Sequence, residues 1–144
     1  MKYFKPSEFR GWFPHMNHDL LEIMDNFREL WGDSTYISPA NGGIGRKLNP
    51  PNKSYHNILR WGEVMAIDLM PRGMTSPQER ERAYECAVEA GALGIGIYPD
   101  WKPRPGIHLD VGKRPGRGLG NPAKWSAFRI NRRQRYFELE RAFR

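Results

Sequence analysis

Two short stretches, far apart in the sequence, carry the side chains best suited to hold a metal ion. The first contains Ser54 and His56 and continues to Asp68, and the second contains His108 and Asp110. Two imidazoles and one carboxylate form a common ligand set of catalytic zinc sites, in which three protein ligands leave a fourth position for water. We therefore predict that His56, Asp68 and His108 bind Zn²⁺.

The apolar residues that surround these side chains indicate β-strands. Strand alternation over residues 64–69 directs Asp68 away from the larger apolar side chains. The same alternation over residues 107–111 places His108 and Asp110 together on the face opposite the core. One strand therefore supplies a metal ligand and a second acid to the same side of a sheet.

Amide hydrolysis at such a site also needs a carboxylate that takes a proton from water and passes it to the leaving amine. Asp110 is the first candidate, because it shares a strand face with His108. It can equally be the acceptor that orients a zinc-bound histidine. Asp100 is the second candidate for the general base and Glu63 the third.

Both stretches resemble motifs of the D-Ala-D-Ala carboxypeptidase-like zinc peptidases. The first resembles the family motif Ser-x-His-x-x-Gly-x-Ala-x-Asp through Ser54, His56, Gly62, Ala66 and Asp68. The second resembles the family's Gly-Ile-Gly-x-Tyr-Pro and x-His-x-Asp signature through residues 94–99 and 106–110. The two motifs occur in the family's order, and the resemblance covers residues 7–125.

This resemblance implies a fold, an activity and a setting. The family includes phage L-alanyl-D-glutamate endopeptidases and shares its fold with the hedgehog signalling domain. The implied reaction is zinc-dependent hydrolysis of an amide bond in the peptidoglycan stem peptide, either as an L-Ala-D-Glu endopeptidase or as a D-Ala-D-Ala carboxypeptidase or endopeptidase. A phage-encoded, endolysin-like enzyme fits this activity.

Three features depart from the family pattern. His56 and Asp68 are more widely separated than in the family, and we expect the additional residues within 57–61. Residues 36–39 lack the family's substrate-binding arginine, so Arg46 and Arg60 become the candidates for that contact. Pro105 stands where many members carry an acid.

Two further residues are candidates for the substrate cleft. We expect Ser54 to support the His56 loop through a local hydrogen bond rather than to act as a nucleophile, because no histidine–acid pair is spaced to activate it. Tyr98 is expected to line the cleft or to pack in the core. His15 and His18 lie in a loop without a further ligand nearby, and we do not expect them to bind metal.

The elements that must position these side chains follow from periodicity and capping. Apolar residues at helical spacing predict a helix over 19–31, and Ser76 followed by Pro77 predicts a second helix that ends near residue 90. Strands are expected at 35–37, 64–69, 94–98 and 107–111, with a Pro-rich hairpin connection at 100–105. This order predicts an α+β fold, a small antiparallel sheet with helices packed on one face.

The C-terminal segment 126–144 is strongly basic. Tyr136, Leu139 and Phe143 form an apolar stripe that predicts a helix over 128–143. We weigh a helix packed on the domain with a solvated basic face equally with an anchor to the cell wall.

Composition limits the possible classes of protein. A chain of 144 residues is expected to form a single domain, residues 1–144, and we expect a monomer. The lone Cys86 excludes an internal disulfide and a cysteine-rich zinc cluster. The net charge of +7 favours an anionic cell-wall surface as partner, and no motif indicates a specific nucleic acid.

The setting follows from the hydropathy pattern. Residues 1–14 lack the continuous apolar segment of a signal peptide, and no stretch is long enough to insert in a membrane. We therefore expect synthesis in a host cytoplasm and action on the wall after release, or a place in the virion.

Two alternatives belong to other classes. A non-catalytic phage structural or wall-binding protein of the same fold would bind zinc without hydrolysis. A basic nucleic-acid-binding protein would bind no zinc, and its affinity for polyanions would fall steeply with salt.

Overall fold

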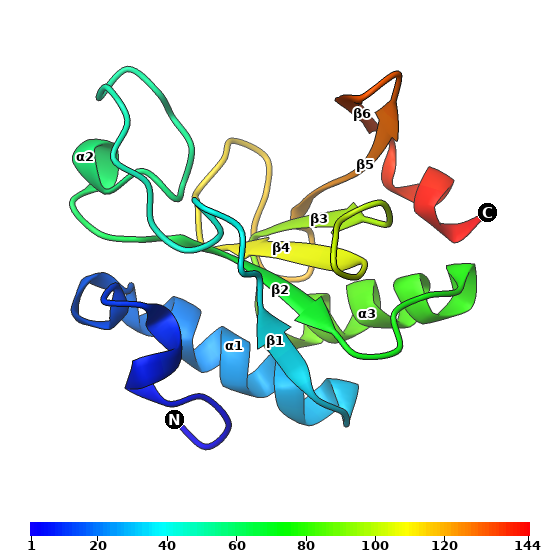
Figure 1. Ribbon diagram of the computed structural model, residues 1–144, viewed down its shortest axis with the longest axis horizontal. Helices are drawn as coiled ribbons and strands as arrows, with labels where there is room; N and C mark the ends of the chain where they lie inside the picture. Colours follow the sequence, from blue (N-terminus) through cyan, green and yellow to red (C-terminus); the bar gives the residue numbers. More distant parts are fainter.

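Six strands form one mixed sheet in the computed structural model, which describes residues 1–144 (Figure 1). The strands are β1 (Thr35–Ile37), β2 (Ala66–Pro71), β3 (Gly94–Tyr98), β4 (Gly106–Asp110), β5 (Ala123–Ile130) and β6 (Arg133–Phe137), in the spatial order β1-β2-β4-β3-β5-β6. The predicted α+β class is confirmed. The hairpin connection between β3 and β4 is also confirmed, because these strands pair antiparallel.

The prediction of a purely antiparallel sheet is wrong at one pair of strands. β3 and β5 run parallel, with Gly94 opposite Ala123, whereas the other neighbouring pairs are antiparallel. The reason is that β4 lies between β2 and β3. β4 ends at Asp110, which lies opposite Gly94, the first residue of β3. Residues 111–122 then cross to the other side of β3 at this same edge of the sheet. β5 therefore begins beside the start of β3 and runs parallel to it.

Two long helices cover one face of the sheet (Figure 1). They are α1 (His18–Trp31) and α3 (Pro77–Ala90), which pack against each other and confirm the two predicted helices. Asn17 caps α1 and Ser76 caps α3 through side-chain oxygens that accept backbone N–H bonds. The remaining helical elements are short: η1 (Pro6–Phe9), η2 (Phe13–His15), α2 (Ile58–Trp61) and η3 (Leu139–Phe143). None of the helices combines the length and apolarity needed to cross a bilayer.

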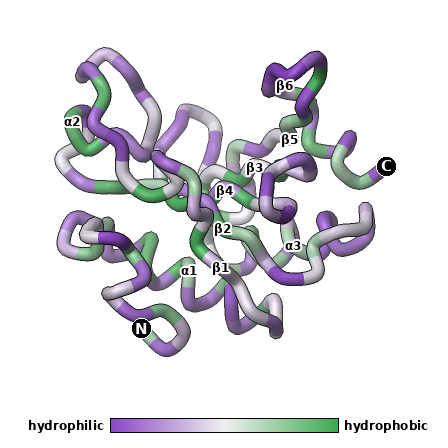
Figure 2. The backbone as a smooth tube through the Cα atoms, in the orientation of Figure 1, coloured by the Kyte–Doolittle hydropathy of each residue, from purple (hydrophilic) through white to green (hydrophobic).

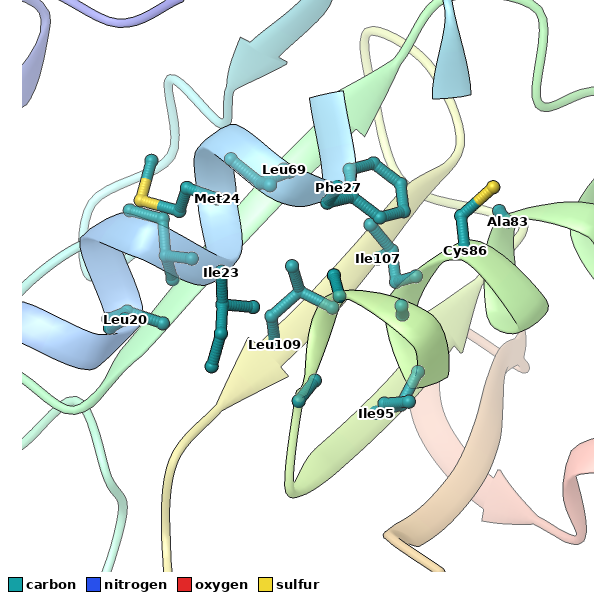
Figure 3. Close-up of a cluster of buried hydrophobic side chains, with 14 of the residues drawn as sticks. Leu20, Ile23, Met24, Phe27, Leu69, Ala83, Cys86, Ile95, Ile107 and Leu109 are labelled. Atoms are coloured by element: carbon teal, nitrogen blue, oxygen red, sulfur yellow. The ribbon is translucent and has the colours of Figure 1, made fainter. Parts of the chain in front are cut away.

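The core lies between these helices and the sheet. It is filled by apolar side chains at helical spacing on α1 and α3 and at alternate positions on the strands, including Leu20, Ile23, Met24, Phe27, Ala83, Cys86, Leu69, Ile95, Ile107 and Leu109 (Figure 3). Hydrophobic residues are concentrated in the central strands, where they alternate with the polar Asp68, His108 and Asp110, and the β5–β6 turn is hydrophilic (Figure 2). Because Leu69, Ile107 and Leu109 face the helices, the alternate residues of β2 and β4 face away from them.

The prediction of a helix in the C-terminal segment 126–144 is wrong. The segment contains the second half of β5, the strand β6 and the short η3. Ile130 pairs with Arg133, so the turn consists of Asn131 and Arg132, whose φ angles are 51° and 66°. Two residues with positive φ form the turn type that matches the twist of a hairpin, and asparagine at its first position is the sequence signal that the apolar stripe obscured.

Candidate metal centre

Asp68 and His108 lie side by side on the sheet face opposite the helices. The register places Asp68 of β2 opposite His108 of β4, then Gly96 of β3 and Trp125 of β5 in the same row. Residues directly opposite one another on neighbouring strands direct their side chains to the same face. The sheet therefore fixes two of the three predicted ligands without help from a loop.

His56 reaches the same face from the loop that precedes α2. The loop is anchored by Asn57, which is fully buried. The Asn57 side chain accepts the N–H groups of Leu48 and Leu59 and donates to the carbonyl of Asn52. The Ser54 hydroxyl accepts the His56 N–H at 3.3 Å, which confirms the supporting role predicted for Ser54.

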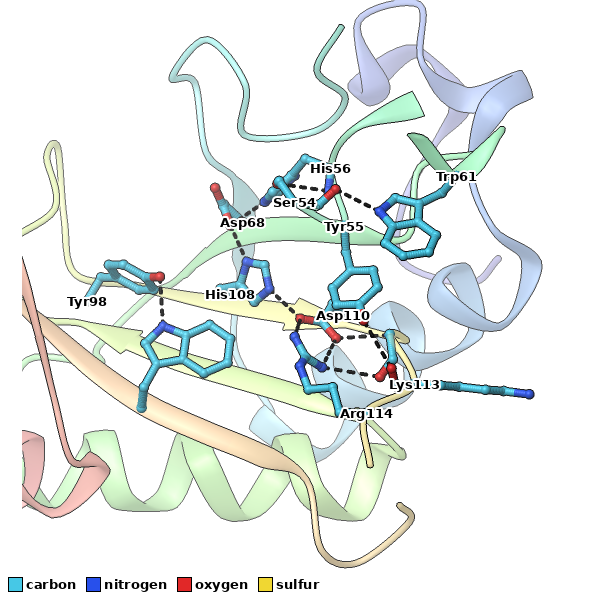
Figure 4. Close-up of polar contacts among 12 residues, drawn as sticks. Ser54, Tyr55, His56, Trp61, Asp68, Tyr98, His108, Asp110, Lys113 and Arg114 are labelled. Atoms are coloured by element: carbon cyan, nitrogen blue, oxygen red, sulfur yellow. Dashed lines mark hydrogen bonds and ion pairs between the residues drawn. The ribbon is translucent and has the colours of Figure 1, made fainter. Parts of the chain in front are cut away.

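The three ligand atoms converge (Figure 4). Asp68 Oδ1 lies 3.3 Å from His56 Nε2 and 3.2 Å from His108 Nδ1. All three atoms lie within 4.8 Å of one another. Ligand atoms bound at about 2.0–2.2 Å around a tetrahedral zinc ion are separated by roughly 3.3 Å. His56 Nε2 is moreover buried without a hydrogen-bond partner, as expected for an atom reserved for a metal ion.

Hydrogen bonds on the far sides of the rings fix the tautomers that metal binding requires. His56 Nδ1 lies 2.6 Å from the carbonyl oxygen of Ile44, and His108 Nε2 lies 2.7 Å from Asp110 Oδ2. Each of these nitrogens donates its proton outward, which leaves His56 Nε2 and His108 Nδ1 as the nitrogens that can bind metal. The residues present therefore fit a zinc ion.

Asp110 is engaged on both of its oxygens. It is fully buried, and the guanidinium of Arg114 donates to both oxygens at 2.9 Å. The N–H of Gly112 donates to Oδ1 at 3.0 Å. A carboxylate held in this way is poorly placed to accept a proton from water. The geometry therefore favours the second role predicted for Asp110, the acceptor that orients His108.

Two glycines of the 94–99 motif make room for these side chains. A Cβ at Gly94 would overlap the Asp110 carboxylate, and a Cβ at Gly96 would overlap the Trp125 indole. Both glycines lie on β3 in rows that face away from the helices. Their role is thus close approach of neighbouring side chains to the backbone, not backbone flexibility.

The charges of the site are strongly coupled. Burial alone would raise the pKa of Asp68, but His56 and His108 lower it well below its ordinary value. Burial disfavours the imidazolium of His108, yet hydrogen bonds to Asp110 and Asp68 raise the pKa of His108 to about 9. A raised pKa favours the protonated imidazole of His108 at neutral pH, so a metal ion that binds Nδ1 must displace that proton.

We expect zinc affinity to rise by up to about tenfold per pH unit between pH 6.5 and 8.5. The pKa of His108 is raised, so its Nδ1 carries a proton below pH 9, and each unit of pH increases the fraction free to bind metal. Zinc titrations against a competing chelator, corrected for the chelator's own protonation, measure this slope. An affinity independent of pH over this interval would contradict the expectation.

The ligands line an open cleft. One cavity of about 330 Å³ contains His56, Asp68 and His108, and an adjoining cavity of about 440 Å³ extends it. The two share Arg46, Asp68, Trp101 and Gln134. We call their combined space the metal cleft. The protein's largest cavity, about 680 Å³, lies beside α1 and contains none of the ligands, so size alone does not locate the chemistry.

Most of the predicted substrate contacts lie in the metal cleft. Ser54 and Tyr98 line its first cavity, and Asp100 lines the second. Arg46 Nη2 lies 3.9 Å from Asp68 Oδ2. Arg60 does not line the cleft: its guanidinium donates to the carbonyl of Pro50 and lies over the Trp61 ring. Of the two arginines, Arg46 is therefore the one placed to contact a substrate.

Sequence reasoning missed four residues of the site. Trp101, Gln134 and Tyr136 line the metal cleft, and Arg114 holds Asp110. Gln134 and Tyr136 are two residues apart, so they share a face in a strand but not in a helix. They could therefore have been found only if the β5–β6 hairpin had been predicted in place of a helix. Arg114 carries no local signal, since it is one of many basic residues after β4.

Comparisons with models of protein families, with curated protein sequences and with solved structures returned no match. The geometry of the metal centre and the two motifs are therefore the features of the chain that bear on its function.

Proposed function

We propose that the protein is a zinc-dependent peptidoglycan peptidase that hydrolyses an amide bond of the stem peptide. The observation that carries this proposal is the convergence of His56 Nε2, Asp68 Oδ1 and His108 Nδ1 within 4.8 Å beside the metal cleft. The motif resemblance supplies the substrate class. An amide hydrolase needs a metal with an accessible side, and the cleft offers that side.

His56, Asp68 and His108 would hold the metal. When bound, zinc lowers the pKa of a coordinated water toward about 7 and polarises the scissile carbonyl. The chain itself contributes orientation: Asp110 fixes the His108 ring, and the Ile44 carbonyl fixes the His56 ring. Arg46 offers a guanidinium beside Asp68, where an anionic group of the substrate could pair with it.

Asp100 is the carboxylate best placed to transfer the proton. It lines the metal cleft together with Asp68, and Oδ2 accepts the backbone N–H of Arg129 at 2.8 Å. That bond fixes the carboxylate and leaves Oδ1 without a partner among the protein's hydrogen bonds. Oδ1 would accept the proton of the attacking water and return it to the leaving amine.

The charge of the protein suits the proposed substrate. The net charge of +7 favours adsorption to anionic polymers of the cell wall. A phage lysin released from the host cytoplasm, or carried by the virion, is the setting we propose.

The test combines metal analysis with digestion of purified peptidoglycan. We expect one zinc per chain by elemental analysis, new peptide termini in the mass spectrum of the digest, and loss of both after treatment with a strong chelator. The new termini also identify the bond. Zinc without cleavage would instead support a non-catalytic wall-binding or structural protein, and a chain without zinc would refute the proposal.

A further inference from the structure

The β5–β6 hairpin supplies one wall of the metal cleft. The register pairs Ala127 with Tyr136 and Arg129 with Gln134, so these side chains share one face of the hairpin. Trp125 lies two residues before Ala127 on that same face. Trp125, Gln134 and Tyr136 all line the cavity that contains the three metal ligands.

Aromatic rings dominate this side of the cleft. Tyr98, Trp101, Trp125 and Tyr136 line the same cavity, and we call these four residues the aromatic wall. Tyr98 and Trp101 are stacked, with ring centroids 4.0 Å apart and an interplanar angle of 18°. The Trp125 ring centroid lies 5.2 Å from that of His108, so the wall begins next to a metal ligand.

Two glycines of the sheet leave room for two of these rings. A Cβ at Gly96 would overlap the Trp125 indole, and a Cβ at Gly106 would overlap the Trp101 indole. Both glycines therefore leave space that an indole fills. The Trp125 and Trp101 indoles thus lie close to the backbone of β3 and β4, beside the metal site.

Hydrogen bonds tie the rings to one another along the wall. Trp125 Nε1 donates to the Tyr98 hydroxyl at 2.9 Å, and Trp101 Nε1 donates to Gln134 Oε1 at 3.2 Å. Gln134 Nε2 donates to the Tyr136 hydroxyl at 2.9 Å. The Tyr136 O–H and the second Nε2–H of Gln134 stay available to a ligand. The wall therefore combines flat apolar faces with unused polar groups at their edges.

Core packing does not explain the outer end of the wall. The Tyr136 side chain belongs to a residue that is 62% exposed, and Gln134 is exposed as well. The proposed hydrolysis uses neither residue. An aromatic ring held in solvent by a hydrogen bond, next to a reactive centre, is typical of a surface that binds a ligand.

We propose that the aromatic wall binds a sugar ring of the glycan strand to which the stem peptide is attached. This inference rests on the proposed function. A pyranose has an apolar C–H face that can stack on Trp101 or Tyr136, and hydroxyl and acetamido groups at its edge that can bond to Gln134. A purely apolar peptide side chain would remove water from the free N–H of the Gln134 amide and offer no hydrogen-bond acceptor in its place. The chemistry of the wall therefore favours a carbohydrate.

A direct binding experiment tests this inference independently of catalysis. The probe is the linear tetramer of N-acetylglucosamine, titrated into the zinc-loaded protein while tryptophan fluorescence is recorded. We expect saturable binding that Tyr136→Ala weakens by about 3- to 10-fold, the loss that corresponds to one aromatic contact. Tyr136→Phe, which keeps the ring, should retain most of the affinity.

Tyr36→Ala is the matched control, because Tyr36 is an exposed tyrosine on β1 that does not line the metal cleft. It should bind the tetramer like the wild type. Absence of binding to the wild type would overturn the inference, as would equal binding by Tyr136→Ala. Preferential binding of a phenylalanine-containing peptide in place of the tetramer would also overturn it.

Kinetics separate this inference from the proposed function. Tyr136→Ala should raise KM about 3- to 10-fold for a glycan-bearing muropeptide, and by a smaller factor for the free stem peptide, which lacks the sugar. Tetramer binding without hydrolysis of either substrate would support the wall and refute the peptidase. Hydrolysis of both substrates with equal KM, and no tetramer binding, would support the peptidase and refute the wall.

Discussion

His108→Ala should lose both the bound zinc and the hydrolysis of peptidoglycan. His108 Nδ1 is one of three ligand atoms, and its ring also connects the site to Asp110. Removal of an outer partner of a metal ligand typically costs 10–100-fold in affinity or activity, and loss of the ligand itself should cost more. Elemental analysis and the release of new peptide termini measure the two effects on the same sample.

His18→Ala is the matched control, since it removes a histidine that is exposed at the start of α1 and lies outside the metal-ligand group. It should retain one zinc and full activity. A further variant, Asp68→Asn, should behave like His108→Ala, because an amide oxygen is a weaker zinc ligand than a carboxylate. Retention of stoichiometric zinc by both ligand variants would show that the metal binds elsewhere.

One local rule, strand alternation, predicts how two of the three candidate metal ligands are placed. Strand alternation separates His108 from Leu109 and Ile107, and it separates Asp68 from Leu69. The structure places both side chains on the face predicted. The pairing of β2 with β4 could not be predicted in this way, because β4 follows β3 in sequence but inserts between β2 and β3. Strand order is set by tertiary packing rather than by local periodicity.

The C-terminal segment shows where such rules fail. Tyr136, Leu139 and Phe143 lie at helical spacing, but the first is on β6 and the others are in η3. Cross-strand pairing of β6 with β5 replaces the helix that the stripe predicted. The helix prediction therefore gave no indication that Gln134 and Tyr136 line the metal cleft, because they reach the cleft only as residues of a strand.

Asp110 illustrates a different limit. Its position on the strand was predictable, but its role depends on Arg114, whose guanidinium lies over the Tyr55 ring and bonds to both carboxylate oxygens. No spacing rule selects one arginine from 23 basic residues. The assignment of Asp110 as an orienting residue therefore required the structure.

Asp110→Ala is expected to have the largest effect on stability among changes near the site. The carboxylate is fully buried, and its removal leaves both the Arg114 guanidinium and His108 Nε2 without their acceptor. Breaking a buried ion pair from one side costs about 3–5 kcal/mol, and we expect about 3 because Arg114 can turn toward water. Zinc affinity should fall about 10–100-fold. Urea denaturation and chelator competition measure the two losses.

The pH dependence of this loss follows from the pKa of Asp110. Burial alone would raise it, but Arg114 and His108 lower it well below its ordinary value. A carboxyl group whose pKa is lowered in the native state stabilises the fold at pH values above its ordinary pKa of about 3.9. This contribution is lost progressively as the pH falls from that value through the lowered native pKa. Wild type and Asp110→Ala should therefore differ most near neutral pH and converge in acid.

A double variant distinguishes an unpaired charge from a simple packing defect. Asp110→Ala combined with Arg114→Ala removes the stranded guanidinium, so it should be more stable than Asp110→Ala alone. Glu81→Ala, which removes an exposed carboxylate of α3, should leave both the unfolding free energy and zinc affinity unchanged. If the double variant were less stable than Asp110→Ala, the packing of Arg114 on Tyr55 would be the dominant contribution rather than its charge. Unchanged zinc affinity in Asp110→Ala would mean that His108 is oriented by its strand alone.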